Sequence, residues 1–138
     1  MRLGLMVPQG WRLDLAGIEP ADQWRAMRDV ALAADQGPFE SIWVFDHFHT
    51  VPIPTEEATH EAWSLMAALG AATERVRLGQ MCTCMGYRNP AYLAKVAATV
   101  DVVSVQPAPR SALRTPTGGA SIGTVGSTSR STPSGRLR

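Results

Sequence analysis

Within residues 1–104, hydrophobic positions alternate between short apolar runs and longer segments in which apolar side chains recur every three or four residues. The short runs "RLGLMVPQ", "SIWVFDH" and "RVRLGQMCTC" have the length and composition of buried strands, whereas the longer segments have the period of one helix face. The pattern therefore predicts strands over residues 2–9, 41–47 and 75–84 and helices over residues 22–37, 60–73 and 89–104.

The helical segments carry their own boundary signals. Gly37 ends the first helix, Asn89 can cap the third, and Pro90 occupies the first helical position of that third helix. The apolar side chains expected in the core are Trp24, Met27, Val30, Ala31 and Ala34 of the first helix and Trp63, Met66, Ala67 and Gly70 of the second.

Three successive strand–helix units predict an α/β fold with a parallel sheet and helices packed against it. In such folds, ligands bind at the carboxyl ends of the strands. Polar residues stand at all three of these ends, namely Gln9 after the first strand, Asp46 and His47 after the second, and the segment 82–84 after the third. The sequence therefore predicts that these residues converge on one rim of the sheet.

The composition changes after Ser104. Residues 105–138 consist mainly of Ser, Thr, Pro, Gly and Arg, and contain no aromatic or acidic residue. Their few hydrophobic residues follow neither a helical nor a strand period, which is typical of disordered segments. Arginines without interleaved aromatic residues do not indicate a nucleic-acid-binding site. We therefore expect a partial domain over 1–104 and a low-complexity, disordered tail over 105–138.

The remaining features favour a cytoplasmic protein without a membrane partner. The formal net charge is +1, no apolar run approaches the roughly 20 residues of a membrane span, and the N-terminus lacks the pattern of a signal peptide. Cys82 and Cys84 would point to opposite faces of an extended chain, so a disulfide between them is not expected.

Three stretches together resemble the luciferase-like monooxygenase superfamily, especially its branch that uses the deazaflavin coenzyme F420. They are "MRLGLMVPQ", "ESIWVFDHF" and "ATERVRLGQMCTCMGYRNPAYLAKVAATVDVVS". The resemblance implies a (β/α)8 TIM barrel, of which this chain would supply the first three βα units. It also implies an oxidoreductase that transfers hydride between a deazaflavin, or alternatively flavin mononucleotide (FMN), and a small organic substrate, or that oxygenates this substrate.

The same resemblance implies roles for the residues of the rim. Asp46 and His47 would lie against the coenzyme ring, with His47 exchanging a proton with the substrate and Asp46 orienting it or hydrogen-bonding the ring. Gln9 and His49, with the loop that starts at His49, would face the substrate.

By resemblance, the end of the third strand would also contact the coenzyme. The segment "MCTC" would form a bulge behind the middle of the ring, with a non-prolyl cis peptide bond within it, and Cys82, Thr83 and Cys84 would present backbone and small side chains to the ring.

Two other kinds of site remain open from the residues alone. His47, His49, Cys82 and Cys84 could ligate a metal together with Asp46 and His60, but metal hydrolases of barrel type take further ligands from later strands, so no metal is predicted. A cysteine nucleophile paired with His47 is the second alternative. The chain lacks the Gly-rich phosphate turn of an ordinary nicotinamide-binding fold.

The chain departs from the family after "ATVDVVS", where family members continue with Gly-Gly-Arg. We expect a truncated gene or a tail translated out of frame, and the alternative function is a non-catalytic remnant or a partner domain without coenzyme. Three strands would leave two sheet edges open and would expose side chains meant for a barrel interior, such as Leu5, Val44 and Leu78. Homo-oligomers formed through these edges are therefore expected.

Overall fold

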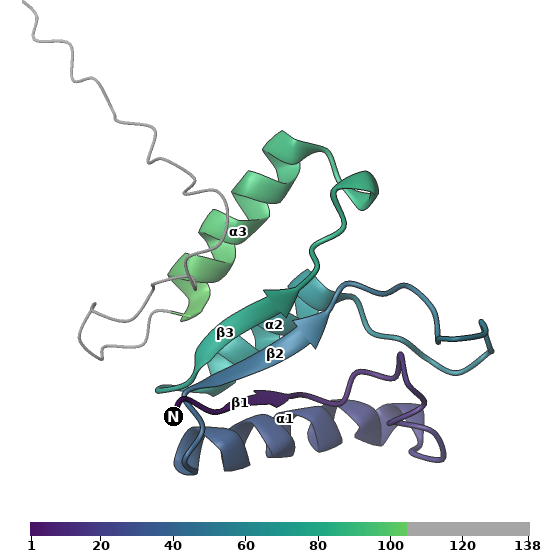
Figure 1. Ribbon diagram of the computed structural model, residues 1–138, viewed down its shortest axis with the longest axis horizontal. Coiled ribbons are helices and arrows are strands. Elements are labelled where there is room, and N and C mark those ends of the chain that lie inside the picture. Colours follow the sequence, from purple (N-terminus) through teal and green to yellow (C-terminus); the bar gives the residue numbers. More distant parts are fainter. Residues whose placement is uncertain (105–138) are drawn as a thin grey trace, which may run out of the picture.

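The computed structural model describes residues 1–104, which form one parallel three-stranded sheet and three α-helices (Figure 1). The predicted alternation of strands and helices is confirmed over this range, and the expected disordered tail 105–138 lies outside the described residues. The elements, in chain order, are β1 (Gly4–Met6), α1 (Pro20–Gln36), β2 (Ser41–Phe45), α2 (Ala62–Ala72), β3 (Arg77–Met81), the short 3₁₀ helix η1 (Met85–Tyr87) and α3 (Pro90–Ser104).

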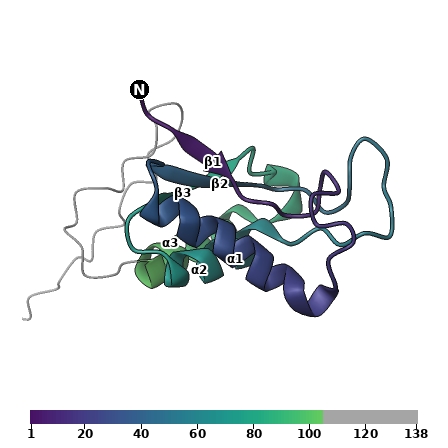
Figure 2. The ribbon, with the colours of Figure 1, turned by 90° about the horizontal axis from the view of Figure 1, so that it is seen from below.

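The sheet has the order β1-β2-β3, with β2 in the centre. All three α-helices lie on the same side of it, as Figure 2 shows. Leu5, Ile42 and Leu78 stand side by side in the strand register and point toward these helices. Val44 follows on the same face of β2 and is only 2% exposed. The expectation that Leu5, Val44 and Leu78 face a barrel interior is therefore wrong, because alternation along each strand directs them to the helix side.

The buried helix faces differ in part from the predicted ones. In α1, Met27, Ala31 and Ala34 are buried as expected, but Trp24 is 39% exposed. The buried face of α2 is broader than predicted because this helix packs against both the sheet and α3. It consists of Ala62, Leu65, Met66, Leu69 and Gly70, whereas the predicted core residues Trp63 and Ala67 are only partly buried.

The helix-free side of the sheet carries the side chains of the alternate strand positions. Trp43 lies in the middle of this side, and its indole spans the two neighbouring strands. A Cβ atom on Gly4 of β1 would come within 2.7 Å of the indole nitrogen, and one on Gly79 of β3 within 2.7 Å of Cζ3. The indole N–H donates to the Ser41 hydroxyl at 2.9 Å. Two glycines thus leave the space in which the indole lies across the sheet.

The carboxyl end of α1 is tied to the loop between α2 and β3. The Asp35 carboxylate accepts hydrogen bonds from three consecutive backbone N–H groups, those of Glu74, Arg75 and Val76, at 2.8 to 3.1 Å. The Arg75 guanidinium donates in return to the carbonyl oxygens of Ala34, Asp35 and Gly37. The Arg75 contacts give hydrogen-bond donors to carbonyl groups at the carboxyl end of α1, where the regular helical pattern stops.

Among the helices of residues 1–104, none has both the length and the apolar composition needed to cross a membrane.

The packing of Trp43 predicts that Gly79→Ala destabilises the protein. The added methyl group would overlap the indole, which must swing away from β3, at a cost of about 1–3 kcal/mol. Chemical unfolding followed by tryptophan fluorescence measures this cost. Gly86→Ala is the matched control, since the nearest atom to its added Cβ would be 3.8 Å away. Equal stability of the two variants would contradict the packing role of Trp43.

The environment of Asp35 predicts a loss of stability in acid. Burial alone would raise the pKa of Asp35, but the hydrogen bonds from the three backbone N–H groups outweigh it and hold the pKa below its ordinary value. The unfolded chain therefore binds the proton first as the pH falls. The stabilisation is complete above the unfolded pKa of about 3.9 and is lost as the pH falls through the folded pKa.

Asp35→Asn should accordingly lower the Tm at neutral pH and reduce the drop in Tm as the pH falls below about 4. Asp29→Asn, an exposed position on the same helix, serves as the control. Thermal unfolding across this pH range measures both effects, and parallel Tm curves for the wild type and Asp35→Asn would contradict the role of Asp35.

Candidate functional site

The three strands end on one rim of the sheet, and Gln9 joins two of these ends. Its side-chain amide donates to the Phe45 and His60 carbonyl oxygens, each at 2.6 Å, and its amide oxygen accepts from the Phe45 N–H at 2.8 Å. The amide group therefore pairs with β2 in the way that a strand backbone does. Gln9 is fully buried. A direct contact of this side chain with substrate would require these three hydrogen bonds to break.

Asp46 and His47 are neighbours in the chain, but their side chains lie on opposite sides of the sheet. Asp46 continues the alternation of Ile42 and Val44 toward the helices, and its side chain is completely buried. His47 continues the alternation of Trp43 and Phe45 on the helix-free side and is partly exposed. The structure thus separates the two residues that resemblance to the family places together against a coenzyme ring.

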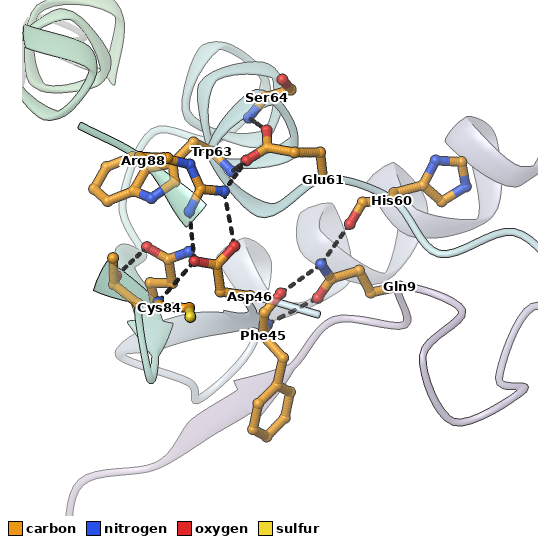
Figure 3. A network of polar contacts seen from close by, with 11 residues as sticks. Gln9, Phe45, Asp46, His60, Glu61, Trp63, Ser64, Cys84 and Arg88 are labelled. Carbon is orange, nitrogen blue, oxygen red and sulfur yellow. Dashed lines mark hydrogen bonds and ion pairs between the residues drawn. The ribbon is translucent and has the colours of Figure 1, made fainter. Parts of the chain in front are cut away.

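The Asp46 carboxylate forms a two-pronged ion pair with the Arg88 guanidinium, at 2.6 and 2.8 Å (Figure 3). It also accepts the backbone N–H of Cys84 at 2.9 Å. Arg88 is itself 8% exposed, and its second partner is the carboxylate of Glu61. Arg88, two residues before α3, therefore binds one carboxylate at the end of β2 and another at the start of α2.

Glu61 caps the amino end of α2. Its carboxylate accepts the N–H groups of Trp63 and Ser64 at 3.2 and 2.7 Å. Burial alone would raise the pKa of Glu61, but the hydrogen bonds from Ser64, Arg88 and Trp63 outweigh it and hold the pKa below its ordinary value. The hydrogen bond to Asp46 and the contact with Glu61 raise the pKa of Arg88.

His47 belongs to an aromatic group on the helix-free side. Its imidazole stacks on the Trp11 indole, with 4.7 Å between the ring centroids and 16° between the planes. The Phe45 ring lies 4.2 Å from Trp11 and 5.8 Å from His47. A partly exposed imidazole beside an apolar, aromatic surface can exchange a proton with a ligand bound on that surface.

The end of β3 has a different backbone from the expected one. Cys82 adopts a left-handed conformation with φ of 60° and has an exposed side chain. The only cis peptide bond among residues 1–104 is Val51–Pro52, so the expected non-prolyl cis bond within residues 81–84 is wrong. The chain leaves β3 through this left-handed residue, a conformation that residues with a Cβ seldom adopt.

Thr83 and Cys84, the next two residues, contact side chains of β3 and of the segment after β2. The Thr83 hydroxyl donates to the Gln80 side chain at 2.5 Å, and the Cys84 backbone contacts Asp46 as described above. His49 is exposed and its Nδ1 hydrogen-bonds the Thr50 carbonyl oxygen at 3.0 Å. Within residues 1–104, no three His, Cys, Asp or Glu side chains are grouped so that they could hold a metal ion.

Arg88, Glu61 and Trp11 are site residues that the sequence patterns did not identify. Glu61 is not among the usual capping residue types, and Arg88 and Trp11 lie in connecting segments without a periodic pattern. A cavity of about 580 Å³ lies between α2 and α3, with Glu61, Trp63, Arg88 and Tyr92 in its wall. His47 does not line it, so this cavity and the aromatic group are separate features.

Comparisons with known proteins agree with this architecture. The chain is 30% identical over 103 residues to the F420-dependent glucose-6-phosphate dehydrogenase of Amycolatopsis mediterranei, an alignment that covers 72% of this chain and 28% of that protein. It is 36% identical over 93 residues to the enzyme of the same name from Nocardia farcinica, covering 64% of this chain and 27% of the relative.

A third relative is the phthiodiolone/phenolphthiodiolone dimycocerosates ketoreductase of Mycobacterium kansasii, with 31% identity over 98 residues, 59% of this chain and 26% of the relative. The chain thus spans about a quarter of the length of the curated relatives it matches. The sequence profile of the luciferase-like monooxygenases matches residues 1–105. The chain therefore belongs to the luciferase-like monooxygenase family.

Proposed function

We propose that this chain forms part of a hydride-transfer site in an oxidoreductase that uses a deazaflavin coenzyme and a small organic substrate. The observation that carries the proposal is the position of His47 on the helix-free side of the sheet, partly exposed and next to aromatic rings, at the carboxyl end of the central strand. Since the chain spans about a quarter of its relatives' length, the proposal concerns the portion of the site that residues 1–104 form.

The arrangement of the sheet supports a place for these units in a larger barrel. In a (β/α)8 barrel the helices cover the outer face of every strand and the inner face carries no helix. The single layer of helices on this sheet has that arrangement, with Trp43 and Phe45 on the side that would face inward. We infer that β1, β2 and β3 are the first three strands of such a barrel.

The residues of the helix-free side fit a flat coenzyme ring. Phe45, Trp11 and the 41% exposed Met81 offer apolar surface around His47. Cys82, which is exposed at the same rim, is assigned to the border of this surface, whereas Thr83 and the Cys84 backbone contact Gln80 and Asp46 on the helix side. The bound coenzyme would supply a ring carbon that accepts or donates a hydride.

In this proposal His47 handles the proton that accompanies the hydride. When an alcohol is oxidised, the imidazole takes the hydroxyl proton while the hydride leaves the carbon, and the C–O single bond becomes a carbonyl. In reduction, the imidazolium returns the proton to the carbonyl oxygen. His49 and the loop that follows it are assigned to the substrate side. Asp46 is assigned to positioning the loop before α3 through Arg88, because its buried carboxylate already accepts three hydrogen bonds.

The names of the relatives favour deazaflavin F420 over FMN and hydride transfer over oxygenation. Two of them are F420-dependent dehydrogenases, and the third is a ketoreductase. A sugar phosphate and a ketone differ widely in size, so these names favour no single substrate for this chain.

The proposal predicts that the full chain binds the deazaflavin coenzyme and that His47→Ala weakens this binding about tenfold, the effect of losing one aromatic or hydrogen-bonding contact of about 1.4 kcal/mol. Perturbation of the coenzyme's visible absorbance band during titration measures the affinity. His49→Ala is the matched control, because its side chain is exposed and lies outside the aromatic group.

Three results would contradict parts of this proposal. Equal and negligible binding by the wild type and His47→Ala would support the non-catalytic alternative. Tighter binding of FMN than of deazaflavin would contradict the choice of coenzyme. Equal loss of affinity in His47→Ala and His49→Ala would contradict the specific role of His47.

The ion cluster predicts that Arg88→Met destabilises the protein by about 3–5 kcal/mol, because it leaves the buried Asp46 carboxylate without its cation. The double variant Asp46→Asn, Arg88→Met should recover part of this loss. Arg25→Met, which breaks the exposed pair with Asp22, should cost at most about 1 kcal/mol. Denaturant unfolding measures all three values, and a similar cost for Arg88→Met and Arg25→Met would show that the cluster is not structural.

A further inference from the structure

The turn that carries Trp11 is fixed from two directions. Gly10 has a φ of 97°, and a Cβ atom at this position would collide with the carbonyl oxygen of Ala58. The Asp14 carboxylate accepts the backbone N–H groups of Gln9 and Gly10 at 2.8 and 2.9 Å. The Trp11 carbonyl oxygen accepts the N–H of Val51, at 2.9 Å, from the loop after β2. The backbone of Trp11 is therefore anchored both to its own turn and to the loop that follows His47.

The indole of Trp11, whose backbone is held in this way, contacts the His47 ring face to face. The two planes are within 16° of parallel, and Phe45 contacts the indole at 4.2 Å between centroids. Face-to-face contact restrains rotation of the imidazole about its χ2 angle, a torsion that is otherwise broad. His49 offers a contrast, since none of the aromatic pairs of the described residues includes it.

We propose that Trp11 is a positioning residue, whose indole fixes the plane of the His47 imidazole at the rim of the sheet. One ring face of His47 is held against Trp11, and the ring edge with its nitrogen atoms stays available to a ligand on the helix-free side. This inference rests on the proposed function of His47 for its importance to a reaction, but the positioning itself is a property of the protein without coenzyme.

A flat aromatic surface is required for this role, and apolar bulk alone does not supply it. A leucine at position 11 would still fill space beside Phe45, but it has no planar face to align an imidazole. A phenylalanine keeps such a face over a smaller area. The pair Trp11→Phe and Trp11→Leu therefore separates alignment of the imidazole from simple packing.

The test is proton NMR of the full chain, which contains three histidines, His47, His49 and His60. His47→Gln assigns the His47 ring resonances by their disappearance. Ring protons that lie over an indole are displaced upfield, so the wild type should show at least one His47 ring resonance upfield of those of His49. Trp11→Leu should remove this displacement, and Trp11→Phe should retain part of it. Thermal unfolding of each variant shows whether the fold persists.

Two outcomes would overturn the proposal. One is a wild-type His47 signal at the position of an exposed histidine, a result that needs no variant and decides the matter even if Trp11→Leu does not fold. The other is an unchanged His47 shift in a folded Trp11→Leu protein. Because no coenzyme is present in these samples, failure of the stack is distinguishable from failure of the proposed function, which appears only in the coenzyme titration.

Discussion

The described part of the chain depends on one buried ion pair, between Asp46 and Arg88. Asp46 directly follows the central strand, and Arg88 precedes the last helix by two residues. Through Glu61, the same guanidinium also reaches the cap of the helix between them. Burying two charges is costly unless each has further partners. Here Asp46 also accepts the backbone N–H of Cys84, and Arg88 also donates to Glu61. Arg88 therefore holds the loop before α3 to the end of β2 and to the start of α2.

This pair also explains how two adjacent polar residues acquire different roles. A strand directs neighbouring side chains to opposite sides, so Asp46 enters the layer between sheet and helices while His47 remains on the open side. The first is buried and paired with Arg88, and the second is partly exposed beside aromatic rings. Asp46 thus attaches neighbouring loops to the strand end, and the next residue, His47, carries the proposed chemistry on the other side of the sheet.

The sequence predicted well where the strands and helices lie, but it predicted poorly which side chains of each helix are buried. Apolar runs and helical periods located all three strand–helix units, because those patterns are local. Trp24 was assigned to the core and is exposed, and Leu65 and Leu69 were missed, because the width of a buried helix face depends on how many neighbours the helix contacts. The side chains of the site depend in the same way on neighbours that a local sequence pattern does not identify.

Asp46 and His47 were located from their place at a strand end, but the partners that define them, Arg88 and Trp11, come from connecting segments that only the folded chain brings near. The left-handed Cys82 also has no signal in the sequence, because residues other than glycine seldom adopt that conformation.

The size of the Trp43 indole restricts which residues can stand beside it in the two neighbouring strands. It lies over Gly4 on one side and Gly79 on the other, so neither neighbour can gain a side chain while a large ring stands at the central position. A smaller residue at position 43 would release both constraints at once and leave room for larger side chains on the outer strands. Substitutions at these three positions should therefore be interdependent, and in related sequences the size of the central residue should vary inversely with the size of the two beside it.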